Sequence, residues 1–499
     1  MVTENTEAVE YDVIVVGGGA VGENVADRTT QGGLRTLMVE SALVGGECSY
    51  WACMPSKVLL RSGAALAAAQ RVPGAAERIL EPGTGPDAAA AVDVAAVLRR
   101  RDAIVSNWSD EGQARWLESA GIDLIRGHAR LSGTRQVSIT AEDGSVTVFT
   151  ARHAVVLSTG SAALLPDIAG LADVTPWTSR EATSVKIMPA SLAIIGGGTV
   201  AVEMATAFRS LGTAVTVIAR TSLLGGQEPF VGTLIGEALE RSGATVLLGV
   251  STTGAIRTQT GDVELTLDNG ESVTASEVLV AVGRVPVTND LGLDAVGLTA
   301  GDWLSVDDTM LVAGDSPALR GDWLYAVGDV NHRALLTHQG KYQARAAGDV
   351  IVARASGTAV DDQPWGAHVA TADQSAVPQV TFTDPEVASV GLTAADAVRA
   401  GHRVRILDYD MAALGGSSTL ADGYIGKARA IVDLDREVII GVTFVGQDVA
   451  ELLHSATIAV VGEVPITRLW HAVPSYPTLS EVWLRLLEQY GRPGAGAAQ

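Results

Sequence analysis

Two cysteines, Cys48 and Cys53, are the only thiols in the 499-residue chain, and four residues separate them in the run GGECSYWACMPSK. A disulfide requires Cα atoms roughly 4.4–6.8 Å apart. Over five residues, a straight helix rises about 7.5 Å and a strand about 16 Å. A Cys48–Cys53 bridge therefore requires a distorted turn, with which Pro55 is compatible. The spacing alone leaves two interpretations open, a redox-active pair and two unrelated buried thiols.

A nucleotide-binding pattern precedes the cysteines. The strand-forming run YDVIVV leads into Gly17, Gly19 and Gly22 in G-x-G-x-x-G spacing, followed by a helix-compatible segment and a second strand that ends at Glu40. In such a unit the first glycine makes the turn and the second lets a pyrophosphate approach. The third lets the helix pack on the strand, and the acid suits a ribose diol. The pattern therefore predicts a bound dinucleotide.

A second unit of this kind contains Gly196, Gly198 and Ala201, and its second strand is followed by Arg220. Alanine is tolerated at the third position, because only a small side chain is needed there. NAD-selective units usually carry an acid at the end of the second strand; here that acid is absent and an arginine follows. Arginine binds phosphate through two parallel hydrogen bonds, so the pattern favours NADPH over NADH. The alternative is that Arg220 lies on a solvated loop.

Together these motifs resemble the pyridine nucleotide–disulfide oxidoreductases, which include glutathione reductase, dihydrolipoamide dehydrogenase and mercuric reductase. The cysteine run is similar to the family signature GG-x-C-x4-C-x-P-[ST]-K, and further motifs follow in the family's order. The resemblance implies an α/β fold with two Rossmann-like domains, for FAD and NAD(P), and a C-terminal α+β dimerisation domain. The implied segments are an FAD domain over 1–165 and 291–365, an NAD(P)H domain over 166–290, and an interface domain over 370–499.

The resemblance also assigns residues to cofactor binding beyond the two glycine loops. They lie in the cysteine run, in the turn STGS, in the return strand VAVGRVP and in the second flavin motif LYAVGDV. An aspartate at the end of that last strand can accept from ribityl hydroxyls, and a helix cap is the plainer alternative. The residues assigned in this way are Gly46, Thr159, Gly160, Gly283, Arg284, Gly328 and Asp329.

The family's chemistry implies roles for the residues around the cysteines. Cys53 would lie nearer the flavin, and Cys48 would exchange with the substrate. Lys57 is predicted to start an apolar-rich helix and, by resemblance, to pair with Glu203 at the contact between flavin and nicotinamide. Oxidised flavin and the Lys57 charge should both favour the reactive thiolate.

The chain departs from the family's thiol-exchanging members near its C-terminus. Those members carry H-P-T-x-x-E, whereas this chain has Tyr476 in the histidine's place and Glu481 in the glutamate's. Tyrosine has a reference pKa near 10 and is a poor base at neutral pH, although it can donate a hydrogen bond. Mercuric reductases also carry tyrosine here, but they usually add a C-terminal cysteine pair. His471 is an alternative base at a different spacing.

The composition limits the classes of function. The formal charge is −22, from 35 basic and 57 acidic residues, so nucleic acid and anionic lipid should be repelled. No apolar run reaches about 18 residues, and the N-terminal run MVTENTEAVE does not resemble a signal peptide. Cysteine usage indicates a reducing cytoplasm, where a cysteine pair is more often catalytic than structural. The segment 71–92 is assigned no function, and no residue is assigned to a metal.

The sequence thus predicts a homodimeric, cytoplasmic FAD enzyme that passes electrons from NADPH through FAD to Cys48–Cys53 and on to a disulfide, a metal ion or a quinone. An NAD-linked dihydrolipoamide dehydrogenase is the alternative within the family, and Tyr476 and Arg220 stand against it. An FAD-binding redox sensor without turnover is the alternative of another class.

Overall fold

The computed structural model of the chain describes residues 9–79 and 92–492, which form two compact units of discontinuous segments. Unit 1 comprises residues 9–54, 102–164 and 284–374. Unit 2 comprises residues 55–79, 92–101, 165–283 and 375–492. Of the segment 71–92, the structure describes a short helix, α4 (Ala76–Ile79), and residues 80–91 lie outside the described residues.

Unit 1 is organised around a seven-stranded sheet with the order β3-β2-β1-β6-β5-β4, in which β16 also pairs with β6. The pairs among β3, β2, β1, β6 and β16 are parallel, whereas β4, β5 and β6 form an antiparallel edge. The strands are β1 (Val9–Val16), β2 (Thr36–Glu40), β3 (Asp123–Arg126), β4 (His128–Gly133), β5 (Gln136–Thr140), β6 (Val146–Leu157) and β16 (Leu324–Ala326). A short antiparallel pair, β7 (Ser161–Ala163) with β15 (Arg284–Pro286), completes the unit's strands.

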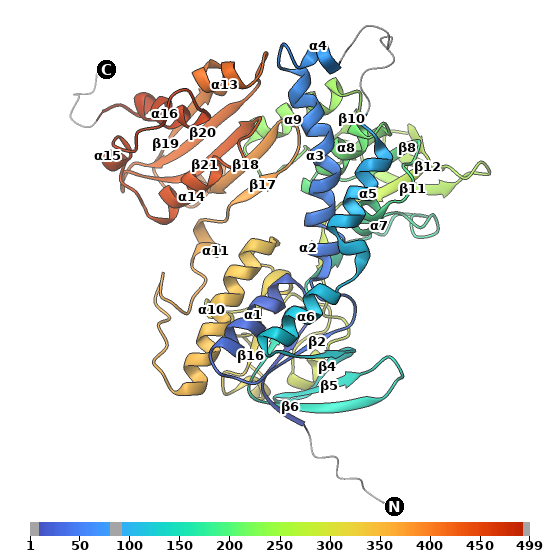
Figure 1. Cartoon of the computed structure of the whole chain (residues 1–499), viewed down its shortest axis with the longest axis vertical. Helices are drawn as coiled ribbons and strands as arrows, with labels where there is room; N and C mark the ends of the chain where they lie inside the picture. The colour runs from blue at the N-terminus through green and yellow to red at the C-terminus, as the bar shows by residue number, and fades with distance from the viewer. Residues whose placement is uncertain (1–8, 80–91, 493–499) are drawn as a thin grey trace, which may run out of the picture. The chain divides into compact units, whose positions relative to one another are not determined.

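The alternation of side chains along β1 builds two cores, one on each face of this sheet. Val13 and Val15 pack in the core that includes side chains of α1 (Ala20–Gln31), α6 (Glu111–Ala120) and α10 (Thr337–Ser356). Ile14 and Val16 face the opposite core, which β4 and β5 help to cover. Burying each such side chain contributes roughly 1.5–3 kcal/mol. The helices α1 and α10 lie side by side (Figure 1). The N-terminus of α1 follows the first glycine loop, and the N-terminus of α10 begins at Thr337.

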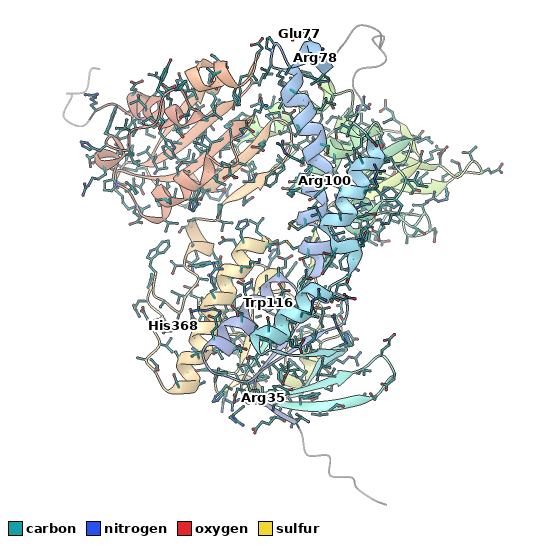
Figure 2. The ribbon with its side chains drawn as sticks, viewed as in Figure 1. Arg35, Glu77, Arg78, Arg100, Trp116 and His368 are labelled. Atoms are coloured by element: carbon teal, nitrogen blue, oxygen red, sulfur yellow. The ribbon has the colours of Figure 1, made fainter. Side chains whose placement is uncertain are left out.

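Arg35, labelled in Figure 2, ties the N-terminal end of this sheet together. Its backbone N–H donates to Asp12, and its guanidinium donates to Asp123 at 3.2 Å. The guanidinium also lies 4.1 Å from the centre of the Tyr11 ring, where a cation is attracted by the ring face. These contacts fix the start of β2, the strand that ends at Glu40.

Unit 2 repeats the parallel-sheet design on a smaller scale. Its four-stranded parallel sheet has the order β10-β9-β8-β14. Leu192 and Ile194 of β8 pack in the core formed with α8 (Thr199–Ser210) and α9 (Pro229–Arg241), whereas Ala193 and Ile195 face the three-stranded antiparallel sheet β11-β12-β13. The strands are β8 (Ser191–Ile195), β9 (Ala214–Ala219), β10 (Thr245–Leu248), β11 (Thr252–Arg257), β12 (Val263–Leu267), β13 (Ser272–Ala275) and β14 (Glu277–Val280).

The C-terminal part of unit 2 is a five-stranded antiparallel sheet with helices, in the order β17-β18-β21-β20-β19. All nine residues of the central strand β21 are buried. Its strands are β17 (Gln379–Thr381), β18 (Glu386–Gly391), β19 (Val404–Asp410), β20 (Lys427–Asp433) and β21 (Val438–Gly446). Its helices are α12 (Ala394–Arg399), α13 (Gly415–Leu420), α14 (Leu453–Val461), α15 (Ile466–Leu469) and α16 (Val482–Tyr490).

This architecture confirms the predicted α/β class with two Rossmann-like parallel sheets and a C-terminal α+β layer. The prediction that a helix starts at Lys57 is wrong, because α3 (Cys53–Gln70) begins four residues earlier. Pro55 lies in the first turn of α3, where its missing N–H would have no partner within the helix anyway. Among the described helices, none combines the length and the apolar character that crossing a membrane requires.

Candidate active site

The cysteine pair lies at a break between two helices of the chain. Cys48 is in α2 (Gly46–Tyr50) and Cys53 is the first residue of α3, while Trp51 between them has a non-helical φ of −137°. The break is the kind of distorted turn that a Cys48–Cys53 bridge requires. Both thiols are half-buried, and the neighbouring Cys53 thiol, together with burial, raises the pKa of the Cys48 thiol. Thr337 at the start of α10 places its hydroxyl oxygen 3.4 Å from the Cys53 sulfur.

The first glycine loop leaves no room for side chains. Gly17 has φ of +102°, and a Cβ on it would lie 2.5 Å from the carbonyl oxygen of Ser158. A Cβ on Gly22 would meet the carbonyl oxygen of Gly17, and one on Gly46 would lie 2.8 Å from the Cα of Gly19. Bare backbone at the N-terminus of the 12-residue helix α1 is suited to a pyrophosphate. The residues present therefore fit the dinucleotide moiety of FAD.

Glu40 stands at the end of β2, beside this loop. Its Oε2 accepts from the backbone N–H of Gly18 at 2.6 Å, and its Oε1 accepts from the N–H of Ala42 at 2.6 Å. The carboxylate is therefore held in one orientation by the backbone on either side of it. It has the fixed placement that recognition of a ribose requires.

A polar chain links the cysteine-bearing helix to two predicted flavin motifs. The Arg284 guanidinium donates to Glu47 at 2.9 Å and to the Ser161 hydroxyl at 2.5 Å. Ser161 in turn donates to Asp329 at 2.5 Å. Glu47, the residue before Cys48, was not singled out by the sequence. The chain fixes α2, and with it the thiol of Cys48, to the second flavin motif.

The other predicted residues of these motifs lie in tight turns. The Thr159 hydroxyl donates to the carbonyl oxygen of Val287 at 2.9 Å. The three glycines Gly160, Gly283 and Gly328 have φ of +73°, +149° and +76°, a region of backbone conformation that favours glycine.

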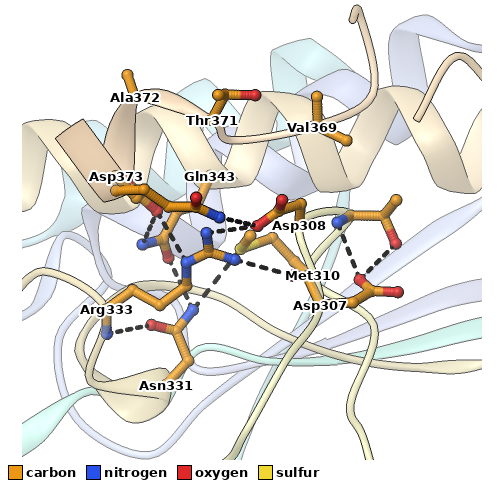
Figure 3. A network of polar contacts seen from close by, with 12 residues as sticks. Asp307, Asp308, Met310, Asn331, Arg333, Gln343, Val369, Thr371, Ala372 and Asp373 are labelled. Carbon is orange, nitrogen blue, oxygen red and sulfur yellow. Dashed lines mark hydrogen bonds and ion pairs between the residues drawn. The ribbon is translucent and has the colours of Figure 1, made fainter. Parts of the chain in front are cut away.

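A buried network of side chains supports the backbone N–H of Gly328, and Figure 3 shows three of its members, Gln343, Asn331 and Asp373. The carbonyl oxygen of the Gln343 side chain accepts from the N–H of Gly328 at 2.8 Å and from Asn331 at 2.9 Å. The amide nitrogen of Gln343 donates to Asp373 at 2.8 Å, and Gln339 donates to the other oxygen of Asp373 at 2.7 Å. Burial raises the pKa of Asp373 despite these donors. Asp373 thus fixes the orientation of the Gln343 amide, and the amide fixes the turn that carries Asp329.

The second glycine loop is more open. Gly196 has φ of +132°, and its Cβ would meet the carbonyl oxygen of Ala281, whereas a Cβ on Gly198 would meet nothing within 4 Å. Ala201 is fully buried where α8 packs on its sheet. Arg220 follows β9 directly and is exposed, and within the described residues its guanidinium makes no ion pair or hydrogen bond. A cation at this position is free to bind an anion.

The structure brings Lys57 and Glu203 together, as the resemblance implies. The Lys57 Nζ lies 2.8 Å from Glu203 Oε2, and the Glu203 side chain is only 4% exposed. The other oxygen of Glu203 accepts from the N–H of Phe382 at 2.9 Å, and the Lys57 ammonium lies 4.9 Å from the centre of the Phe382 ring. Both carboxylate oxygens therefore have partners, which a buried charge requires.

Tyr476 and Glu481 are also neighbours, but they differ in exposure. Tyr476 is 77% exposed and Glu481 is 5% exposed. A Cβ on Gly415 would lie 3.3 Å from both the Tyr476 hydroxyl and Glu481 Oε2, so both groups line one space. Glu481 Oε2 has no hydrogen-bond partner among the described residues, and Oε1 lies 3.6 Å from Arg485. His471, the alternative base, is exposed beyond the end of α15.

The residues that sequence reasoning missed are those brought in by distant elements. Glu47 occupies the variable position of the cysteine signature, so the motif gives no signal for it. Thr337 and the Gln343 network belong to α10, nearly 300 residues after the cysteines. Within the part of the chain that the structure describes, no cluster of three His, Cys, Asp or Glu side chains is placed to hold a metal ion.

Comparisons with known proteins agree with this arrangement. The family described as "Pyridine nucleotide-disulphide oxidoreductase" matches residues 11–357, and the dimerisation domain of that family matches residues 377–486. A dihydrolipoyl dehydrogenase of Chlorobaculum tepidum is 29% identical over 485 residues, which cover 96% of each chain. A mercuric reductase of Streptomyces lividans is 30% identical over 489 residues, again 96% of each chain.

One solved structure has the same fold at lower identity. It is the Cu(II) complex of the HOCl-induced flavoprotein disulfide reductase RclA from Escherichia coli, with a TM-score of 0.79 and 20% identity. The similarity covers 96% of this chain and 99% of that one.

Proposed function

Because this chain belongs to the pyridine nucleotide–disulphide oxidoreductase family, and is therefore an oxidoreductase that uses FAD and NAD(P)H, we propose that it carries electrons from NADPH to the Cys48–Cys53 pair and on to a small-molecule acceptor. Its C-terminal dimerisation domain indicates a homodimer. FAD, when bound, supplies the transfer of a hydride equivalent from nicotinamide and of two electrons to the disulfide.

The proposal rests on one observation, the placement of both half-buried thiols at a helix break that Glu47 and Arg284 tie to two flavin motifs. Oxidation of the pair to a disulfide releases two electrons and two protons to the acceptor, and NADPH with one proton restores both thiols. We assign Cys48 to exchange with the acceptor and Cys53 to the contact with the flavin.

The remaining site residues take binding and positioning roles in this proposal. The glycine loop from Gly17 to Gly22 and the N-terminus of α1 would bind the FAD pyrophosphate, and Glu40 the adenosine ribose. Gly46, Thr159, Gly160, Gly283, Arg284, Gly328 and Asp329 would shape the rest of the FAD site. The second loop, Gly196, Gly198 and Ala201, would bind NADPH, whose 2′-phosphate Arg220 would hold. Lys57, paired with Glu203, would lie where nicotinamide meets flavin.

The acceptor belongs to one of three classes. The names of the relatives point to lipoamide-type disulfides and to Hg²⁺, and a quinone is a third acceptor for such a flavoprotein. Tyr476 in place of a histidine favours delivery of electrons over proton-coupled thiol exchange, since a tyrosine is a poor base near neutral pH. Glu481 beside it would orient the Tyr476 hydroxyl. His471 is the other candidate for acid–base chemistry.

Steady-state oxidation of NADPH with lipoamide, glutathione disulfide, Hg²⁺ and a quinone would identify the acceptor. Cys48→Ser serves as the matched variant, because it removes the exchanging thiol and leaves the glycine loops intact. We expect reduction of a disulfide or of Hg²⁺ to be lost in Cys48→Ser, whereas quinone reduction directly from the flavin should persist. A single stoichiometric oxidation of NADPH with every acceptor would instead identify a sensor. Strong lipoamide activity linked to NADH would identify a dihydrolipoamide dehydrogenase.

A further inference from the structure

The segment 220–228, which begins at the arginine assigned to the 2′-phosphate, packs on the second glycine loop. Leu224 donates its backbone N–H to the carbonyl oxygen of Gly197 at 2.7 Å, and its side chain is buried. A Cβ on Gly197 would lie 2.9 Å from the carbonyl oxygen of Ser222, so the two backbones are in close contact. The position of this segment therefore sets where the Arg220 guanidinium can meet a phosphate.

The far end of the segment is fixed by a buried carboxylate. Glu228 directly precedes α9, and its side chain is only 2% exposed. Its Oε1 accepts from the backbone N–H of Ala394 at 2.7 Å, and its Oε2 accepts from the Arg429 guanidinium at 2.8 Å. Both partners belong to the C-terminal part of unit 2, because Ala394 begins α12 and Arg429 lies in β20. Each oxygen of the buried charge therefore has a partner, as such a charge requires.

The direction of the Arg429 guanidinium is itself fixed. It donates two hydrogen bonds to the carboxylate of Asp408 in β19, at 2.6 and 2.7 Å. Because a guanidinium is planar, these two bonds also fix the direction of the nitrogen that donates to Glu228. Arg429 and Lys427 further lie 5.2 and 4.7 Å from the centre of the Phe230 ring, in the first turn of α9. The C-terminal sheet thus holds the start of α9 through charged groups.

We propose that Arg429 and Glu228 anchor the segment 220–228 to the C-terminal sheet and thereby hold Arg220 where it meets the 2′-phosphate of NADPH. Neither charge has another role in the proposed function, and a buried ion pair by itself contributes little to stability. The inference rests on the proposed function, because Arg220 is assigned there to the 2′-phosphate. It makes Arg429 and Glu228 positioning residues, which act through Arg220.

Two nucleotides that differ only in the 2′-phosphate separate positioning from stability. Adenosine 2′,5′-bisphosphate and adenosine 5′-phosphate are titrated into the FAD-loaded enzyme by calorimetry, which requires no turnover. We expect Arg429→Met to weaken binding of the bisphosphate about three- to tenfold and binding of the monophosphate less than about twofold. Arg403→Met, which removes a 70% exposed arginine just before β19, is the matched control and should change neither affinity.

A second variant covers a loss of the fold. If Arg429→Met is purified without flavin or without a cooperative unfolding transition, Glu228→Gln/Arg429→Met takes its place. This double variant has no unpaired buried carboxylate, yet the end of the segment keeps only the N–H of Ala394 as a partner. It should show the same selective loss of affinity for the bisphosphate.

Equal losses for the two nucleotides, or no loss for either, would overturn the inference. Arg220→Met tests the proposed function separately and should weaken binding of the bisphosphate alone, by about tenfold or more. In Arg220→Met/Arg429→Met the second substitution should add little, because the anchor acts through Arg220. A full additional loss would overturn the inference. An unchanged affinity in Arg220→Met refutes the proposed role of Arg220, whereas a selective loss in Arg220→Met without one in Arg429→Met refutes only the anchor.

Discussion

The two glycine loops are built alike and end differently. Each follows a buried parallel strand, turns at a glycine with positive φ, and opens a 12-residue helix. In the first loop the residue at the end of the second strand, Glu40, is fixed by the N–H groups of Gly18 and Ala42. In the second loop Ala219 stands at the corresponding position, and the next residue, Arg220, is exposed and has no partner among the described residues.

The helices of the two loops also carry acids in different states. Glu203 on α8 has a partner for each oxygen, whereas Glu23 on α1 is largely buried with one oxygen unpaired. The same strand–loop–helix backbone can therefore hold two kinds of nucleotide site. The first loop is closed by its own chain, as suits a resident cofactor, and the second keeps a free charge, as suits a nucleotide that binds and leaves.

We expect the largest effect from a substitution at the third position of the glycine motif, which is Gly22 in the first loop and Ala201 in the second. A Cβ on Gly22 would meet the carbonyl oxygen of Gly17, while Ala201 already carries a Cβ at the corresponding place. We expect Gly22→Ala to be purified with little or no flavin, measured as visible absorbance per protein. Gly198→Ala in the second loop, where a Cβ meets nothing within 4 Å, should remain fully yellow. A fully yellow Gly22→Ala protein would show that the first loop is not the flavin site.

Glu203, the acid on the helix after the second loop, loses its ion-pair partner when Lys57 is replaced. Lys57→Met would leave the buried Glu203 carboxylate with only the Phe382 N–H. Because Lys57 is itself one-third exposed, we expect a loss of about 1–3 kcal/mol of unfolding free energy, measured by denaturant titration. Adding Glu203→Gln should recover part of this loss, since a neutral amide costs less to bury. A double variant as unstable as Lys57→Met would contradict this account of the pair.

The second strand of the first unit ends at the acid Glu40, whereas the basic Arg220 follows that of the second unit. Reversing the charge of Arg220 should change the preference between NADPH and NADH. We expect Arg220→Glu to lower the ratio of kcat/KM for NADPH to that for NADH about 10- to 100-fold, because a phosphate partner is lost and a repulsion is added. Arg241→Glu, an exposed charge reversal at the end of α9, is the control for net charge. Equal kcat/KM for the two nucleotides in the unaltered enzyme would rule out this role of Arg220.

The unpaired acid of the first loop should produce the smallest effect. The pKa of Glu23 is raised to about 7 in the folded chain from its ordinary value of 4.5, so its ionisation opposes folding increasingly as pH rises from 4.5 through 7. We therefore expect Glu23→Gln to stabilise the protein by about 1–2 kcal/mol more at pH 8 than at pH 5. Urea unfolding at the two pH values measures the difference, and an equal effect at both would mean that Glu23 does not titrate in this range.

Local sequence patterns were sufficient to predict the glycine loops, but they did not predict the contacts between residues far apart in the sequence. The glycines, the strand ends and the helix break at the cysteines follow from spacing and backbone sterics. The Lys57–Glu203 pair followed from resemblance alone, since nothing local couples residues 146 positions apart. The links from Glu47 to Arg284 and from Gln343 to Asp373 depend on how β15 and α10 pack, which no motif encodes. The sequence places the helix start at Lys57, whereas α3 begins at Cys53, because a proline such as Pro55 is tolerated in the first turn of a helix.

The central claim is that Cys48 and Cys53 form the redox centre, with Cys53 against the flavin. Anaerobic titration of the holoenzyme with one equivalent of NADPH tests it most directly, through the long-wavelength absorbance of a thiolate in contact with oxidised flavin. We expect the band in the parent enzyme, no band in Cys53→Ser, and in Cys48→Ser a band even before NADPH is added. If neither the parent nor Cys48→Ser showed the band, and both serine variants were only less stable, the cysteine pair would be structural and the account would be wrong.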